Sequence, residues 1–232
     1  MKLLALDTSS EGCSAALFVD GEISERFELS PRGHTRLLMP MVRELLAEKG
    51  LAPAQLDALA FACGPGSFTG LRIATGVVQG LAWGLDIPVV PISTLAAVAL
   101  GAMDTLKLEG EQGVAVAFDA RMGEVYWGCF VCRAGLPVLQ GEERVCAPSA
   151  VSLAGTAESW AGAGRGWALR EAMPETVAGR ISELDDTLVP RASWVARLAV
   201  EGFRQGLAVP AEQAQPVYLR DEVTWKKLPG RD

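Results

Sequence analysis

Two aspartates, Asp7 and Asp119, each stand at the end of an apolar run that has the composition of a buried strand. Carboxylates in such positions can hold a divalent cation against the phosphates of a nucleotide. Asp7 is followed by two hydroxyl side chains, Thr8 and Ser9, that could contact the same phosphates. The pattern therefore suggests a nucleotide site made of Asp7, Thr8, Ser9 and Asp119, although a strand-ending aspartate is often only a turn former.

A glycine-rich segment, residues 64–72, carries glycine at positions 64, 66 and 70 between an apolar run and a helical pattern. Such a junction can bind an anion, because the free N–H groups and the helix dipole point the same way. Its glycine order is that of neither a P-loop nor a dinucleotide-binding turn. The spacing favours a tight strand-to-helix turn with Ser67 or Thr69 as the helix N-cap. A second glycine cluster, residues 161–166, is likewise interpreted as a loop.

Other catalytic side chains are sparse. His34 is the only histidine, so a centre with two histidine ligands is excluded, and it is expected to lie exposed just before the first helix. The five cysteines are an odd number without a paired framework, which favours reduced thiols. Cys129 and Cys132 fall on opposite faces of a predicted strand, so we do not expect a redox or zinc site there.

The composition favours a packed globular protein. Half of the 232 residues are hydrophobic and 21% are charged. The formal net charge of −7 disfavours autonomous binding to nucleic acid or to an anionic membrane. No apolar run reaches the ~18 residues of a membrane span, and the N-terminal run is too short for a signal peptide. We expect a cytoplasmic protein.

The chain contains an internal repeat. Residues 3–7, 13–19 and 22–29 read as strands, followed by a helix over 35–49, a strand over 59–63, a helix over 70–84, a strand over 89–92 and a helix from 93. The order of strand, aspartate, turn, strand, turn and strand returns at 114–119, 125–131 and 138–145, and a last helix spans 193–205. Such a duplication predicts an α/β fold of two βββαβα halves, as in actin, hexokinase and Hsp70. We place the halves at residues 1–105 and 106–232, with the tail returning to the first half.

The helix over 70–84 carries Gly76, Gly80 and Gly84 at four-residue spacing. Each glycine costs a helix about 1 kcal/mol relative to alanine. A glycine face therefore suggests that something packs close to the helix backbone. We expect this to be the sheet of the same domain rather than a partner helix.

Several segments together resemble the bacterial TsaB (YeaZ) family over nearly the full length: residues 4–9, 64–72, 88–95, 119–126, 216–220 and 225–227. The resemblance implies a role in making N6-threonylcarbamoyladenosine (t6A) at position 37 of tRNA. It implies a heterodimer with TsaD, which transfers threonylcarbamoyl from threonylcarbamoyl-AMP, and docking of the ATPase TsaE on that pair. It also implies tRNA contact only through the complex, and no tightly bound cofactor, with ATP, ADP or Mg²⁺ at the complex interface. When the chain is alone we expect a homodimer, because a large exposed apolar surface is unfavourable in water.

The same resemblance points to a noncatalytic subunit. TsaD-like chains carry a His-x-x-x-His metal motif, and this chain has Thr94 and Val98 at the corresponding positions. A neutral hydroxyl is a weak ligand and valine offers no lone pair, so no metal site is expected there. We therefore predict a scaffold and activating subunit without catalytic residues.

The resemblance places the TsaD contact on the first two helices. The predicted interface side chains are Leu37, Leu38, Met41, Val42, Leu45, Ala74, Val77 and Leu81. Two other functions remain open: an ATP-dependent kinase or hydrolase that uses Asp7 and Asp119, and a glycoprotease-like hydrolase that would depend on His34.

Overall fold

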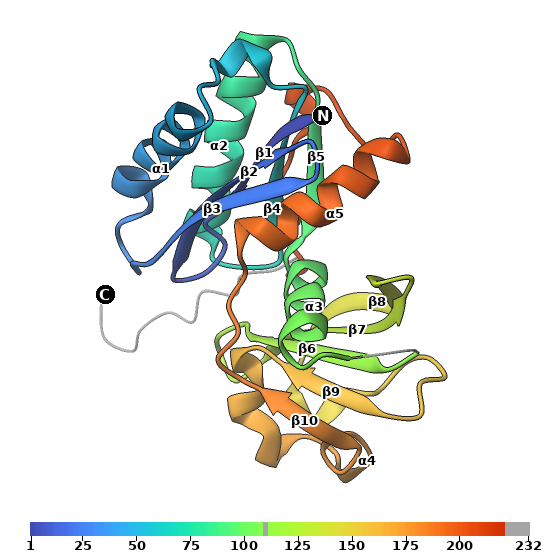
Figure 1. Cartoon of the computed structure of the whole chain (residues 1–232). Helices are drawn as coiled ribbons and strands as arrows, with labels where there is room; N and C mark the ends of the chain where they lie inside the picture. Colours follow the sequence, from blue (N-terminus) through green and yellow to red (C-terminus); the bar gives the residue numbers. More distant parts are fainter. Residues whose placement is uncertain (109–110, 221–232) are drawn as a thin grey trace, which may run out of the picture.

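The computed structural model describes residues 1–108 and 111–220, which fold into two α/β lobes joined through a central helix (Figure 1). The first lobe is built on a five-stranded sheet in the order β3-β2-β1-β4-β5. The antiparallel strands β1 to β3 are followed by β4 and β5, which run parallel to β1. The strands are β1 (Lys2–Asp7), β2 (Gly12–Val19), β3 (Glu22–Leu29), β4 (Ala58–Gly64) and β5 (Val89–Ser93).

The second lobe repeats this topology. Its sheet has the order β10-β9-β6-β7-β8, in which β6, β7 and β8 are antiparallel neighbours and β9 and β10 join in parallel. β6 thus takes the place of β1. The strands are β6 (Gly113–Asp119), β7 (Val125–Arg133), β8 (Leu136–Cys146), β9 (Trp160–Ala163) and β10 (Ile181–Asp185). The matching order confirms the duplicated actin/hexokinase-like fold that the sequence repeat predicts.

The helices cover both faces of the first sheet. Helices α1 and α2 pack on one face, α5 packs on the other, and α3 lies against the second sheet (Figure 1). The helices are α1 (His34–Glu48), α2 (Phe68–Leu85), α3 (Thr94–Thr105), α4 (Glu175–Ala178) and α5 (Ala192–Arg204). Short 3₁₀ segments lie at Pro53–Gln55, Pro148–Ala150, Arg165–Ala172 and Ala211–Gln213. Within the described ranges, no helix is both long and apolar enough to cross a membrane.

The period-two pattern of β1 determines which helix each face receives. Leu4 and Leu6 point into the core under α1 and α2, whereas Leu3 and Ala5 face α5. The α5 side is rich in alanine on both the sheet and the helix, which lets the helix backbone come close to the strands. Large side chains fill the thicker layer under α1 and α2.

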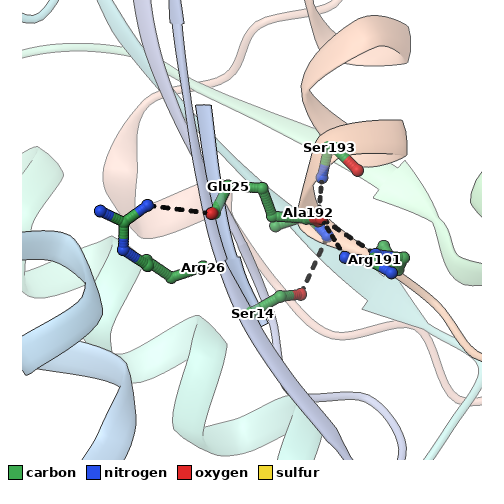
Figure 2. A network of polar contacts seen from close by, with 6 residues as sticks. All are labelled: Ser14, Glu25, Arg26, Arg191, Ala192 and Ser193. Atoms are coloured by element: carbon green, nitrogen blue, oxygen red, sulfur yellow. Dashed lines mark hydrogen bonds and ion pairs between the residues drawn. The ribbon is translucent and has the colours of Figure 1, made fainter. Parts of the chain in front are cut away.

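Helix α5 is held on the first sheet by polar groups from two strands (Figure 2). The amide of Ala192 donates to Ser14 Oγ at 2.9 Å, and the amide of Ser193 donates to Glu25 Oε1 at 2.9 Å. Arg191 donates to Glu25 Oε2 through Nη2 at 2.6 Å and through Nε at 2.9 Å. These contacts satisfy N–H groups that the helix itself leaves free. The last described helix therefore belongs to the first lobe in space, although it follows the second lobe in sequence.

Candidate functional site

Asp7, at the end of β1, and the next two residues, Thr8 and Ser9, are buried. Ser9 donates to Asp7 Oδ1 from its backbone N at 3.1 Å and from its hydroxyl at 2.6 Å. The hydroxyl of Thr8 donates to the carbonyl of Gly70 at 2.7 Å. The two hydroxyl groups predicted to contact phosphate are thus bonded within the chain.

The glycine-rich segment packs against this turn. A Cβ atom added at Gly66 would lie 2.5 Å from the Ser9 carbonyl oxygen, and one at Gly70 would lie 1.9 Å from that of Thr8. The Ser67 hydroxyl accepts from the Gly70 amide at 3.3 Å, which confirms Ser67 as the N-cap of α2. These glycines therefore let two stretches of the chain's own backbone approach each other, as a tight strand-to-helix turn requires.

The carboxyl of Asp7 is the most strongly perturbed acid in this turn. Its Oδ2 atom is buried and has no hydrogen-bond partner. Burial raises the pKa of Asp7 from 3.8 to about 6, and the two hydrogen bonds from Ser9 offset part of that rise. Asp7 is thus a buried acid in an apolar setting, with one oxygen satisfied and the other not.

Asp119 occupies the equivalent position in the second lobe but a different environment. Its side chain is half exposed, accepts from the Arg121 amide at 2.7 Å and forms an ion pair with the Arg121 guanidinium at 3.5 Å. Asp7 has one carboxylate oxygen without a hydrogen-bond partner, and the glycine-rich segment packs against the carbonyls of the next two residues, Thr8 and Ser9. The two strand-ending aspartates thus differ in burial and in partners, and nucleotide binding by Asp7, Thr8, Ser9 and Asp119 stays a prediction. Among residues 1–108 and 111–220, no group of three or more His, Cys, Asp or Glu side chains could hold a metal ion.

The predicted exposure of His34 is wrong. The residue is the first of α1 and is only 7% exposed, because the start of the helix covers the β1–β2 turn. Its Nε2 atom lies 2.9 Å from the carbonyl oxygen of Ser10. Burial also raises the pKa values of the Cys13 and Cys63 thiols to about 12, so both are protonated at neutral pH and are weak nucleophiles.

The two positions that align with the histidines of TsaD-like chains have structural contacts. Thr94 is fully buried at the start of α3, and its hydroxyl accepts from the Gly64 amide at 3.2 Å. Val98 lies one helical turn later in the core between α3 and the second sheet. The hydroxyl of Thr94 thus helps to hold the glycine-rich turn.

Five of the eight predicted interface side chains lie in the core of the chain itself, which corrects their assignment to a partner surface. A hydrophobic stripe alone does not tell which surface covers it, and here the stripe covers the first sheet. The five are Leu38, Met41, Val42, Leu45 and Ala74. The other three, Leu37, Val77 and Leu81, are partly buried at the edge of the same core.

In contrast to these core residues, the outer face of α2 is exposed. A Cβ atom added at Gly76, Gly80 or Gly84 would meet nothing within 4 Å outside the helix's own backbone, so the expectation that the sheet packs against these glycines is wrong. Trp83, on the same side of the helix, is 74% exposed. Together with the segment at Ala211–Gln213, this face forms an open hollow. Trp83 was not predicted from the sequence, although it lies three residues after Gly80 and directly before Gly84, two of the glycines that mark this face.

The second glycine cluster is only partly a loop. Its first three residues form the end of β9, and the turn follows. A Cβ atom at Gly164 would lie 2.6 Å from the Ala117 carbonyl oxygen at the end of β6. The two lobes thus use glycine in the same way. They also touch here, because Arg165 forms an ion pair with Glu11 of the β1–β2 turn.

Comparisons with known proteins agree with the fold. A family model for TsaD, "tRNA N6-adenosine threonylcarbamoyltransferase", matches residues 28–227. The chain is 40% identical to the tRNA threonylcarbamoyladenosine biosynthesis protein TsaB of Escherichia coli, with 100% of both chains covered. It is 42% identical to TsaB of Haemophilus influenzae, covering 100% of this chain and 99% of that one. YeaZ from Pseudomonas aeruginosa superposes with a TM-score of 0.88 at 47% identity, over 94% of this chain and 99% of the other.

Proposed function

This chain belongs to the TsaB (YeaZ) family of tRNA threonylcarbamoyladenosine biosynthesis proteins, and we propose that it serves that pathway as a noncatalytic activating subunit. Its partner in this proposal is a threonylcarbamoyltransferase of the TsaD type, which carries out the transfer to adenosine 37. The ATPase TsaE joins the pair, tRNA is bound through the complex, and the assembly acts in the cytoplasm. Without its partner, the chain pairs with a second copy of itself.

One observation carries the pairing proposal: the outer face of α2 combines three glycines in open space with a large exposed aromatic side chain. The open glycines permit the backbone of a partner helix to approach closely, and Trp83 offers the buried anchor that protein interfaces favour. Exposure of a tryptophan to this extent is unfavourable in water. A second helical surface would cover it.

The noncatalytic proposal is supported by the environment of each candidate nucleophile and base. Asp7 is fully buried, His34 is buried beside the Ser10 carbonyl, and Thr94 accepts a hydrogen bond from Gly64 of the glycine-rich turn. None of these groups is presented to a substrate in this arrangement. Binding of ATP, ADP or Mg²⁺ at the interface with the partner stays a prediction.

Pairing is tested with Trp83→Glu in a mixture with the purified TsaD-type partner, measured by size-exclusion chromatography with light scattering. We expect at least tenfold weaker heterodimer formation, because the variant places a charge at the centre of the proposed interface. Leu38→Arg is unsuitable, since Leu38 is a core residue and its loss would unfold the chain. Arg133→Glu, at an exposed site at the end of β7, controls for the added charge. Unchanged pairing of Trp83→Glu would remove α2 from the interface.

A further inference from the structure

The last residues that the structure describes, 215–220, run from the first lobe to the second, and we call them the C-terminal strap. Directly before the strap the chain is anchored, because Ala211 and Ala214 are buried in the core under α1 and α2. Within the strap itself every residue is exposed or only partly buried. Segments with few buried contacts open locally at a lower free energy than the core does.

The strap is attached to the first lobe by contacts at the surface. The Val217 amide donates to the Cys63 carbonyl at 2.7 Å, and the Tyr218 hydroxyl accepts from Arg72 Nε at 3.2 Å. The Tyr218 ring lies 5.4 Å from the Phe68 ring between centroids, and both rings are exposed. These few contacts hold the strap in place without burying it, so it can be released while the core stays folded.

The strap ends on the β6–β7 turn of the second lobe. Arg220 donates to the Ala120 carbonyl at 3.1 Å and forms an ion pair with Glu124, so it holds the turn at both of its ends. Between them, Arg121 and Met122 take φ values of 66° and 57°. This backbone is unfavourable for residues other than glycine and persists only where surrounding contacts hold it. Arg220 supplies such contacts.

The strap begins in the hollow beside α2 that the proposed function assigns to the partner. Gln215, its first residue, lines that hollow together with Gln79 of α2. The Gln79 side chain donates to the Ala214 carbonyl at 2.9 Å, which fixes the point where the strap starts. A partner helix in the hollow would cover this hydrogen bond, and a hydrogen bond shielded from water is stronger than an exposed one.

We propose that the C-terminal strap is a releasable tether between the hollow on α2 and the β6–β7 turn. In the free chain the strap opens locally and detaches Arg220 from the turn. A partner seated in the hollow keeps the strap closed, so that pairing on the first lobe orders a turn of the second lobe. The inference rests on the proposed function, because the occupant of the hollow is taken to be the TsaD-type partner.

Hydrogen–deuterium exchange of the full-length chain tests the release of the strap, first without a partner. The Val217 amide reports on the strap, and the Glu124 amide, which donates to the Arg121 carbonyl at 3.0 Å, reports on the turn. We expect the Val217 amide to exchange about a hundredfold faster than the amides at the centre of β4. Equal exchange rates of Val217 and β4 would mean that the strap opens only when the whole chain unfolds, and would overturn the proposal.

Arg220→Gln tests the attachment to the second lobe. We expect the Glu124 amide to exchange about tenfold faster in this variant, with the core amides unchanged. Glu11→Gln is the matched control, because it removes another ion pair between the lobes, that with Arg165, and leaves the strap intact. Equal acceleration in both variants, or none in Arg220→Gln, would show that Arg220 does not tether the turn.

The purified TsaD-type partner is then added to the unchanged chain and to Arg220→Gln. On pairing we expect the Val217 amide to exchange about tenfold more slowly in both, and the Glu124 amide to slow only in the unchanged chain. Unchanged exchange of Val217 on pairing would overturn the proposal, and so would slowing of Glu124 in the variant. If no heterodimer forms, the proposed function fails, whereas the measurements on the free chain still decide whether the strap opens.

Discussion

The buried Asp7 carboxyl makes the stability of this fold depend on pH. Its pKa is raised from 3.8 to about 6 by burial, so the folded chain holds the proton more tightly than the unfolded chain does. The contribution of protonated Asp7 to the free energy of unfolding is fully present below about pH 4. It is lost as the pH rises from about 4 to about 6, because the unfolded state then ionises first. A pKa difference of about two units between the folded and unfolded chain changes the free energy of unfolding by about 3 kcal/mol.

Asp7→Asn removes this titration. We expect the free energy of unfolding of the variant, relative to the unchanged chain, to rise by roughly 2–3 kcal/mol between pH 4 and pH 7. Urea unfolding at both pH values measures that difference, and other titrating groups cancel in the comparison. Asp119→Asn is the matched control, because that strand-ending carboxylate is half exposed. A difference between Asp7→Asn and the unchanged chain that does not depend on pH would contradict the account.

The inner face of helix α2 packs in the core, whereas the glycines of its outer face lower the stability of the helix. Gly80 has nothing within 4 Å of the position that a Cβ atom would occupy, apart from the helix's own backbone. Gly80→Ala is therefore expected to stabilise the isolated chain by up to about 1 kcal/mol, seen as a higher melting temperature. If a partner helix packs closely against this face, the same methyl group will weaken pairing several-fold in a titration with the TsaD-type partner. Stabilisation with unchanged pairing would show that no partner backbone approaches Gly80.

Helix α5 depends on capping groups from other elements. Glu25 is largely buried and accepts from Arg191 and from the Ser193 amide at the N-terminus of the helix. Glu25→Gln is expected to lower the free energy of unfolding by about 2 kcal/mol, since charge-assisted hydrogen bonds are lost. Denaturant unfolding measures the loss. Glu22→Gln is the control on the same strand, where an exposed ion pair with Lys49 contributes little. Equal effects of the two changes would contradict the capping role.

The elements themselves were largely predictable from the sequence. Each predicted strand and helix of the first lobe lies within two residues of an observed one, because β1 and β4 are continuous apolar runs and α1 has a clear helical stripe. In the second lobe, β9, β10 and α4 were missed. β9 is only four residues long and includes Gly162, where a side chain would collide with Trp167. Such short elements are determined by long-range packing rather than by local pattern.

The site was less predictable than the fold. The sequence marked both Asp7 and the glycine-rich segment as candidate sites, but spacing did not reveal that this segment packs against the carbonyls of Thr8 and Ser9. It also could not tell that Leu38 faces the sheet whereas Trp83 faces solvent, because both positions fit helical periodicity. The rings of Phe68 and Tyr218 are in contact although the residues lie 150 positions apart in sequence, so only the folded chain reveals this contact.

At the scale of the whole molecule, two lobes of matching topology are held together by contacts between their ends. The ion pair of Glu11 with Arg165 and the contacts of Arg220 join elements of both lobes and the C-terminal segment. In this acidic chain, exposed large apolar side chains lie on α2 and near the junction of the lobes. These surfaces are where the proposed role as an activating subunit can be tested.

The most direct test of the central claim is threonine incorporation into unmodified tRNA. The reaction contains a purified enzyme that makes threonylcarbamoyl-AMP, the TsaD-type and TsaE-type proteins, ATP and bicarbonate, with and without this chain. The account predicts incorporation only when the chain is present, and loss of it with Trp83→Glu but not with Arg133→Glu. Equal incorporation in the absence of the chain would contradict its role as an activating subunit.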